Sequence, residues 1–218
     1  RGRPAMTREI LLVPHANRQQ NLEATSRAAE LLQSAGITVR VCADEKVLPG
    51  LKHVPHTEDA ADGCELVLVL GGDGTFLRAA DMARAVDIPV LGINLGHVGF
   101  LAEWEVESLD QALVRVIEKR YRIEDRLTID VSIFDEEGTL LNRSWALNEA
   151  SVENQNRSGV LDAILEVDRR PVSSFGCDGV LISTPTGSTA YAFSAGGPVL
   201  WPSLDAILVV PNLSLIHI

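Results

Sequence analysis

Hydrophobic residues in the first half of the chain form short continuous runs, and segments with helical spacing separate these runs. Residues 9–13 (EILLV) and 66–70 (LVLVL) are almost wholly apolar, which is typical of strands buried on both faces. Residues 21–35 place apolar side chains at helical spacing, and Gly36 stands where a left-handed cap would end the helix. The same reasoning predicts two more strands and one more helix at residues 37–41, 89–93 and 109–119. This alternation predicts a parallel sheet with right-handed crossovers.

The pattern changes near residue 126, where apolar and polar residues begin to alternate with a period of two. Residues 127–133 show this alternation, which is typical of a half-buried strand, and a turn leads to an expected partner strand at 139–150. Two more strands are expected at residues 160–168 and 172–175. We therefore predict a Rossmann-like parallel α/β domain over residues 1–123 and a β-rich, antiparallel, sandwich-like domain over residues 124–218.

Composition and charge limit the kinds of partner that the chain can bind. It carries 19 basic and 30 acidic residues, a net charge of −11, which argues against nucleic acids and membranes as partners. No stretch reaches the length of a transmembrane helix, and the polar start at residues 1–7 is too short for a signal peptide. The three cysteines show no paired metal spacing, so we expect a reduced, cytoplasmic protein.

The strand at residues 66–70 runs directly into a glycine-rich loop, GGDGT, which precedes an expected helix from Phe76. The members of the loop are Gly71, Gly72, Asp73, Gly74 and Thr75. Thr75 is expected to cap the helix, and amides at a helix start attract phosphate. The loop is not a P-loop, because no Gly-Lys-Ser/Thr follows, and Leu77 stands where the dinucleotide fingerprint requires glycine. A tight turn capped by an aspartate would fit these residues alone as well.

Two later stretches narrow the choice among proteins that carry GGDGT, which include NAD kinases, lipid kinases of the diacylglycerol type and, in looser form, phosphofructokinases. The first is Asn148-Glu149, at the end of an expected strand, and the second is TPTGSTAY at residues 184–191. With these three motifs in family order and spacing, the chain closely resembles the bacterial NAD kinase family, and specifically its actinobacterial members. The resemblance covers residues 9–212, whereas lipid kinases share only the first motif.

The resemblance implies transfer of a phosphoryl group from ATP, or in some members from polyphosphate, to the 2′-hydroxyl of the adenosine ribose of NAD. A ribose hydroxyl is a poor nucleophile, so a carboxylate that takes its proton helps the reaction. Asp73 matches the general base of the family, although a carboxylate there could also hold a metal. A divalent cation (Mg²⁺ or Mn²⁺), the glycine-loop amides and Arg78 could neutralise the phosphate charge. Taken alone, Arg78 fits a solvated helix residue better.

The resemblance also implies which residues bind the nucleotide. Asn148 presents a donor and an acceptor that complement adenine, and the family places Glu149 at the nucleotide too. Asp178 matches a position that faces the far end of the dinucleotide. Five further residues match positions around the adenosine: Phe100, Thr189, Ala190, Tyr191 and Ser194. Without the other motifs, Asn148-Glu149 would fit an ordinary strand end.

Two rival functions stay open at this point: a lipid or sugar kinase that shares GGDGT, and a non-catalytic NAD-binding fragment. The resemblance implies a homodimer or homotetramer for the full-length protein. Residues 213–218 (LSLIHI) do not match the family, whose chains continue well beyond this point, and these six residues can be encoded by the end sequence of a transposon adapter. We therefore expect a second domain that is cut short.

Overall fold

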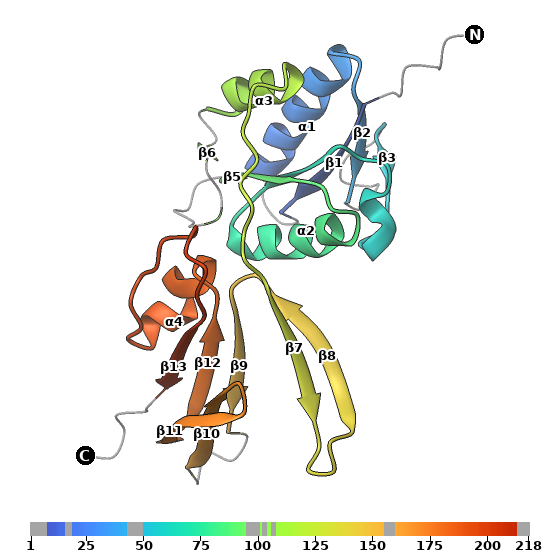
Figure 1. Ribbon diagram of the computed structural model, residues 1–218. Helices are drawn as coiled ribbons and strands as arrows, with labels where there is room; N and C mark the ends of the chain where they lie inside the picture. Colours follow the sequence, from blue (N-terminus) through green and yellow to red (C-terminus); the bar gives the residue numbers. More distant parts are fainter. Residues whose placement is uncertain are drawn as a thin grey trace. The chain divides into compact units, whose positions relative to one another are not determined.

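The computed structural model describes residues 8–15, 19–42, 50–94, 101, 104–105, 108–154 and 160–212, of which 19–21 and 104–105 are described as backbone only. Phe100 and the tail at residues 213–218 lie outside the described residues. The chain forms two compact units, Arg1–Ile123 and Glu124–Ile218, and each unit is a separate body of structure (Figure 1).

The first unit is built on a six-stranded parallel sheet with the strand order β3-β2-β1-β4-β5-β6. The strands are β1 (Glu9–Pro14), β2 (Thr38–Val41), β3 (Lys52–His53), β4 (Leu66–Leu70), β5 (Val90–Asn94) and β6 (Trp104–Glu105). This is the strand order of the dinucleotide-binding Rossmann sheet, in which strand addition changes direction between β1 and β4. The parallel α/β fold expected from the sequence is confirmed. The two-residue strands β3 and β6 are too short to show a period, and the sequence pattern did not predict them.

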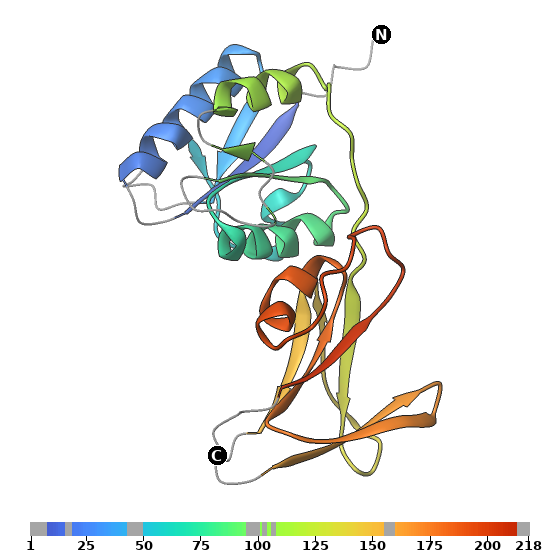
Figure 2. The same cartoon turned by 90° about the vertical axis from the view of Figure 1, so that its left-hand side faces the viewer.

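Helices cover both faces of this sheet, which explains why its central strands are apolar along their whole length. The helices are α1 (Gln19–Ser34), α2 (Asp73–Ala85), α3 (Leu109–Ile117) and the 3-10 helix η1 (Glu58–Ala61). Figure 2 shows α1 and α3 on one face and α2 on the other. Within β1, Ile10 and Leu12 join the core under α1 and α3, whereas Leu11 and Val13 join the core under α2 and η1. Successive side chains therefore enter opposite cores.

Arg8 ties the end of α3 to the amino ends of the central strands. Its guanidinium donates to Glu65 Oε1, with the two nitrogens 2.8 and 2.6 Å from that oxygen, and also donates to the carbonyls of Val116 and Ile117. Lys119 forms a second ion pair with Glu65. The last carbonyls of a helix lack partners within the helix, and Arg8 supplies donors to two of them, although the Val116 carbonyl also accepts from the amide of Lys119 at 3.1 Å.

The second unit consists of antiparallel strands in three small sheets, with the orders β7-β8, β10-β11 and β13-β12-β9. The strands are β7 (Ile129–Phe134), β8 (Leu140–Ala146), β9 (Glu149–Glu153), β10 (Leu161–Val167), β11 (Arg170–Cys177), β12 (Gly179–Ser183) and β13 (Leu208–Asn212). A 3-10 helix, η3 (Thr186–Thr189), and a short helix, α4 (Tyr191–Ser194), follow β12. The β-rich, antiparallel character expected for this part of the chain is confirmed.

The expected single strand at residues 139–150 is wrong, because the structure divides it at Leu147-Asn148. Strand β8 pairs with β7, whereas β9 changes partner and pairs with β12. Residues 139–150 contain no glycine or proline, so turn signals in the sequence could not locate the break. The backbone at the break is held instead by residues that lie more than thirty positions later in the sequence.

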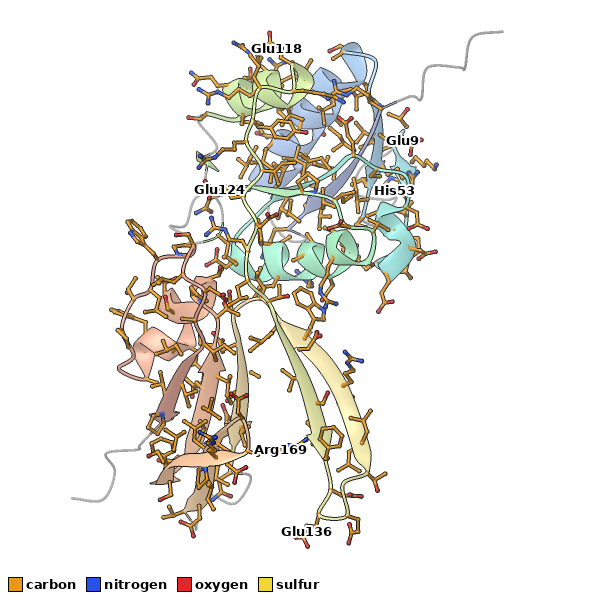
Figure 3. All side chains as sticks on the ribbon, viewed as in Figure 1. Glu9, His53, Glu118, Glu124, Glu136 and Arg169 are labelled. Carbon is orange, nitrogen blue, oxygen red and sulfur yellow. The ribbon has the colours of Figure 1, made fainter. Side chains whose placement is uncertain are left out.

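Tight turns close the two hairpins of this unit, and Figure 3 labels a residue at the tip of each, Glu136 and Arg169. Asp168 and Arg169 both have positive φ, at 51° and 63°, and Val167 pairs directly with Arg170. This is the geometry of a two-residue type I′ turn, which fits the right-handed twist of the flanking strands. Among the helices of the described residues, none is both long and apolar enough to cross a membrane.

Candidate active site

The GGDGT loop lies at the carboxyl end of β4, beside the carboxyl end of β1. The amide of His15 donates to the carbonyl of Leu70 at 2.9 Å, and the amide of Gly71 donates to the carbonyl of Ile93 at 3.0 Å. A Cβ on Gly71 would lie 3.0 Å from both His15 Cβ and Thr75 Oγ1, so a side chain fits poorly there. Open α/β sheets bind their ligands at this edge, at the point where strand order reverses.

Helix α2 begins earlier than expected, at Asp73 rather than Phe76. The cap residue is Gly72, in an extended conformation, and its carbonyl accepts from the amides of Thr75 at 3.0 Å and Phe76 at 3.1 Å. The prediction that Thr75 caps the helix is therefore wrong, because Thr75 lies inside the first turn. The amides of that first turn sit at the positive end of the helix dipole, which favours a bound phosphate.

The Asp73 carboxylate lies half-buried at the first position of α2. Its Oδ1 accepts a hydrogen bond from the backbone amide of Leu101 at 3.1 Å. Leu101 belongs to the segment that follows β5, the next strand of the sheet. The orientation of the carboxylate is therefore restrained by a segment outside its own helix. An aspartate that only capped a tight turn would not need this contact.

The other residues of the loop divide into a buried group and an exposed group. Thr75 is 2% exposed, and its Oγ1 has no hydrogen-bond partner within the described part of the chain. Gly74 and Arg78 are exposed and lie four residues apart, so they share one face of α2. The structure therefore brings Arg78 to the same side as the loop, while Phe100 lies outside the described residues.

Asn148 and Glu149 lie where β8 ends and β9 begins, and a buried polar cluster surrounds them. Within the described residues, Asn148 Oδ1, Glu149 Oε2 and Thr186 Oγ1 are buried without a hydrogen-bond partner. Burial raises the pKa of the Glu149 carboxyl above its ordinary value. Buried polar atoms are nearly always paired in folded proteins, so three unpaired atoms in neighbouring segments indicate a place for a polar ligand.

Thr186 is the site residue that sequence reasoning did not single out. It is 8% exposed and is the first residue of η3, which packs against the backbone of Asn148 through Gly187. The only signal in the sequence is the density of hydroxyls in TPTGSTAY. Periodicity could not distinguish which of these hydroxyls pair within the loop and which stay unpaired.

Four of the residues expected around the adenosine lie in α4 or just before it. Thr189 and Ala190 are half-buried, and Tyr191 and Ser194 are exposed. The side-chain amide of Asn212, at the end of β13, donates to the Tyr191 hydroxyl at 3.0 Å. This hydrogen bond restrains the orientation of an aromatic ring that is 39% exposed and therefore accessible to a ligand.

Asp178 lies apart from this cluster. It precedes β12, and its amide donates to the carbonyl of Asn212 at 2.9 Å, whereas Glu149 pairs with Ser183 at the other end of the same strand. At roughly 3.3 Å per residue, Asp178 and Ser183 are about 17 Å apart along β12. Within this unit the structure therefore does not bring Asp178 to the polar cluster.

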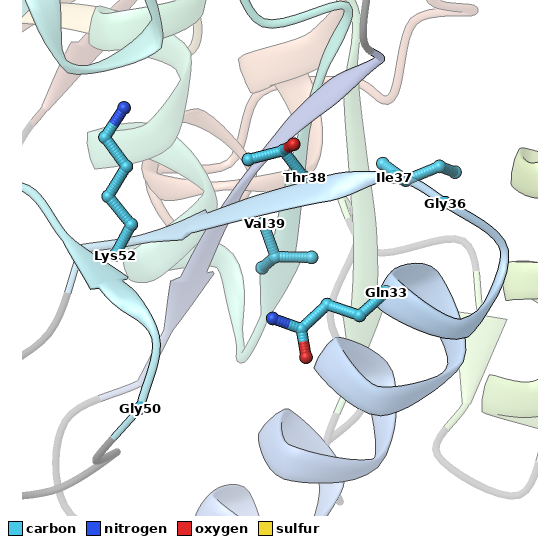
Figure 4. A pocket seen from close by; sticks show the side chains of 7 residues that line it. All are labelled: Gln33, Gly36, Ile37, Thr38, Val39, Gly50 and Lys52. Atoms are coloured by element: carbon cyan, nitrogen blue, oxygen red, sulfur yellow. The ribbon is translucent and has the colours of Figure 1, made fainter.

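A groove in the first unit is unrelated to these residues. It lies beside the amino end of β2, between the last turn of α1 and β3 (Figure 4), and has a volume of about 470 Å³. Its lining residues are Gln33, Gly36, Ile37, Thr38, Val39, Gly50 and Lys52. None of them belongs to the predicted site, and the glycine loop lies at the opposite, carboxyl end of the parallel strands.

The first unit is a Rossmann sheet with a carboxylate in a glycine loop at its switch point. The second unit is β-rich and contains a polar cluster. Together these features define the class of two-part nucleotide-binding proteins. The chain belongs to the NAD kinase family. The model of the ATP-NAD kinase N-terminal domain matches residues 10–121, and the model of the ATP-NAD kinase C-terminal domain matches residues 147–218. These matches exclude the lipid and sugar kinases that share only GGDGT.

Similar proteins agree with this assignment. The chain is 68% identical to the NAD kinase of Corynebacterium efficiens over 213 residues, which cover 94% of the chain and 67% of the relative. It is 72% identical to the NAD kinase of Corynebacterium glutamicum over 193 residues (85% and 66%), and 57% identical to that of Rhodococcus jostii over 230 residues (97% and 71%). The chain spans about two thirds of the length of these relatives.

Two solved structures share the fold. The crystal structure of yeast NADH kinase complexed with NADH has a TM-score of 0.84 and 24% identity, and the match covers 98% of this chain and 69% of that one. The crystal structure of an NAD kinase from Archaeoglobus fulgidus in complex with ATP has a TM-score of 0.70 and 27% identity, with coverage of 97% and 74%.

Proposed function

We propose that the chain transfers a phosphoryl group from ATP to the 2′-hydroxyl of the adenosine ribose of NAD, giving NADP and ADP. The observation that carries this proposal is the Asp73 carboxylate, which Leu101 orients at the start of α2. The related proteins named above as NAD kinases, and the A. fulgidus enzyme seen in complex with ATP, support the choice of substrates.

In this reaction Asp73 takes the proton from the 2′-hydroxyl of the ribose. At the same time the oxygen of that hydroxyl bonds to the γ-phosphorus of ATP. The bond from that phosphorus to the bridging oxygen breaks, and ADP leaves. A positioned carboxylate helps because the neutral hydroxyl is a poor nucleophile. The first-turn amides of α2 and the exposed Arg78 would stabilise the charge on the transferred group.

A divalent cation would bind at this site together with the nucleotide. Mg²⁺ is commonly held by one or two carboxylates together with substrate phosphates, and the alternative role of Asp73, in place of the general base, is that of a protein ligand to the cation beside the phosphate loop. Among the described residues, no group of three His, Cys, Asp or Glu side chains forms a metal cluster of its own. When bound with the nucleotide, Mg²⁺ or Mn²⁺ would neutralise phosphate charge.

The polar cluster of the second unit would recognise the adenine and ribose of NAD. Asn148 Oδ1, which is buried and unpaired within the described residues, can accept from the exocyclic amine of adenine. Glu149 and Thr186 offer further polar atoms, and Tyr191 offers an aromatic face. Thr189, Ala190 and Ser194 complete the loop, and Asp178 would contact the far end of the dinucleotide.

A coupled assay for NADP formation tests the proposal. We expect turnover with NAD, ATP and Mg²⁺, and loss of turnover when EDTA removes the cation. Isothermal titration calorimetry with NAD alone distinguishes a kinase from the other hypothesis, a non-catalytic NAD-binding protein. Such a protein would bind NAD without producing NADP in the assay. Replacement of ATP by polyphosphate in the same assay decides which donor the enzyme accepts.

We also propose a homo-oligomer in a reducing, cytoplasmic compartment. The β7–β8 hairpin exposes four large apolar residues, each more than half exposed: Ile133, Phe134, Leu140 and Leu141. An apolar surface of this kind commonly marks an interface, and analytical ultracentrifugation would measure the assembly. The cysteines Cys42, Cys64 and Cys177 are free and buried, and burial raises the pKa of Cys42 to about 11 and also raises the pKa of Cys64, which disfavours the reactive thiolate at these two positions.

A further inference from the structure

We infer that Thr184 and Gly187 are positioning residues, which together form a clasp on the backbone of Leu147 and Asn148 and so aim the Asn148 carboxamide at the adenine of NAD. This inference rests on the proposed function, because it takes Asn148 to be the adenine-binding residue. Neither Thr184 nor Gly187 needs to touch the substrate. Both act through the segment that they hold.

The clasp is needed because the sheets do not hold this segment. The β7–β8 ladder has its last pair at Ile129 and Ala146, and the β9–β12 ladder has its first pair at Glu149 and Ser183. Leu147 and Asn148 lie between the two ladders. Their carbonyls must therefore find partners elsewhere, since unpaired buried backbone groups are costly.

Thr184 supplies most of these partners. Its hydroxyl donates to the carbonyl of Leu147 and accepts from the amide of Gly187 at 3.0 Å, so one side-chain oxygen bridges the two segments. The amide of Thr184 donates to the carbonyl of Asn148 at 2.8 Å, and the Ser183 hydroxyl donates to the same carbonyl at 3.2 Å. Thr184 is fully buried, so water cannot replace its hydroxyl.

Gly187 completes the clasp by close approach. A Cβ at this position would lie 2.1 Å from the carbonyl oxygen of Asn148 and 2.4 Å from its carbonyl carbon. Non-bonded atoms do not approach this closely, so any side chain at position 187 would displace the Asn148 backbone. The φ angle of Gly187 is not positive, and its requirement for glycine therefore comes from this contact alone.

The clasp fixes the backbone of Asn148 and leaves its side chain available. Asn148 Oδ1 has no partner within the described residues, so nothing in this part of the chain competes with a ligand for that atom. Asn148 is therefore preorganised, because its main chain is fixed while its carboxamide stays available to a ligand. Loosening the main chain should therefore weaken binding of the group that the tip recognises.

The test compares Thr184→Val with Thr184→Ser. Valine keeps the shape of threonine and removes both hydrogen bonds of the hydroxyl, whereas serine keeps the hydroxyl. We expect Thr184→Val to raise KM for NAD by about tenfold, as the loss of these two buried hydrogen bonds predicts. The KM for ATP should change by less than about twofold, and Thr184→Ser should restore most of the affinity for NAD.

Ser188→Ala is the matched control. Ser188 is an equally buried hydroxyl in the same loop, but it donates to Pro185 at 2.7 Å and accepts from the amide of Leu200 at 2.8 Å, away from Asn148. We expect this variant to lower thermal stability about as much as Thr184→Val, without a selective rise in KM for NAD. An equal rise in KM for NAD in both variants would overturn the inference.

Hydrogen–deuterium exchange separates the clasp from the proposed function. Peptides that cover residues 147–150 should exchange faster in Thr184→Val than in the wild type or in Ser188→Ala, whether or not the protein turns over NAD. If the wild type makes no NADP and binds no NAD, the proposed function fails, and with it the role of the clasp in adenine recognition. If the wild type is active while Thr184→Val leaves both KM for NAD and exchange unchanged, the inference fails alone.

Discussion

The backbone amide of Leu101 donates a hydrogen bond to Oδ1 of Asp73 at 3.1 Å, which joins the segment after β5 to the first turn of α2. An amide donor of this kind would serve an asparagine at position 73 as well as an aspartate. The contact therefore permits a substitution that removes the basicity of the side chain and keeps its orientation.

We expect Asp73→Asn to lower kcat by roughly 10²–10⁴-fold, the usual cost of losing a general base. Binding of NAD should stay within a few-fold, because the base acts mainly in the transition state. Steady-state kinetics and calorimetry with NAD measure the two effects. Retention of a third or more of the wild-type rate would refute the assignment of Asp73 as the base.

We expect Asn148→Ala to raise KM for NAD more than KM for ATP. The substitution removes Oδ1, the buried and unpaired acceptor, while the backbone carbonyl that Thr184 holds stays in place. The contact with adenine is made in the ground state and the transition state alike, so kcat should change little. Initial-rate measurements with each substrate varied in turn provide the comparison, and equal effects on both substrates would argue against an adenine contact.

We expect Glu149→Gln to stabilise the ligand-free protein at pH 7. Burial raises the folded-state pKa of Glu149 above its ordinary value of 4.5, so the folded state holds the proton more tightly than the unfolded state. The resulting cost is absent below pH 4.5 and grows as pH rises through the raised pKa, after which it is constant. Urea denaturation at pH 4 and pH 7 should show the gain in stability only at pH 7. A gain of equal size at both values would contradict this explanation.

We expect Arg8→Met to destabilise the first unit by about 2 kcal/mol at pH 7, because it removes charge-assisted hydrogen bonds to Glu65 and to the end of α3. Burial raises the pKa of Glu65, but the hydrogen bonds from Arg8 and Lys119 outweigh burial and lower it. The contribution of the ion pair is therefore present above about 4.5 and is lost as pH falls through the lowered pKa.

The control for this prediction is Arg27→Met. Arg27 pairs with Asp110 on α3, but both side chains are more than half exposed, at 51% and 58%. Exposed ion pairs contribute little to stability, so the midpoint of unfolding should hardly change. Chemical denaturation of both variants at pH 7 and at a series of lower pH values gives the comparison, and a destabilisation by Arg8→Met that does not shrink as pH falls below 4.5 would contradict the role of Glu65.

Local patterns in the sequence predicted much of the fold. The run at β4 followed by three glycines predicted a buried strand that ends at a phosphate-binding loop, and the structure places that loop at the switch point of the sheet. The change of period after residue 126 predicted an antiparallel second part. Both signals depend only on neighbours along the chain, which a sequence shows directly.

Contacts between distant residues were out of reach of the same reasoning. The start of α2 was misplaced by three residues for a local reason, because Thr75 is a good capping residue in general but here Gly72 caps the helix and Thr75 lies inside its first turn. The break between β8 and β9 depends on Thr184, and no pattern near residue 147 indicates it. Thr186 was missed for the same reason, since its role depends on which hydroxyls of its loop find partners.

The glycines of the two motifs impose two different kinds of constraint. A side chain at Gly187 would collide with the backbone of Asn148 and one at Gly71 would crowd His15 and Thr75, whereas a Cβ at Gly72 or Gly74 would meet nothing within 4 Å. The first pair therefore belongs to the architecture of the fold and would be needed even in a relative that had lost its activity. At Gly72 and Gly74 the fold itself sets no steric requirement for glycine, so a requirement for glycine there would come from a bound ligand, and substitutions at these two positions would be tolerated in a family member that no longer binds one.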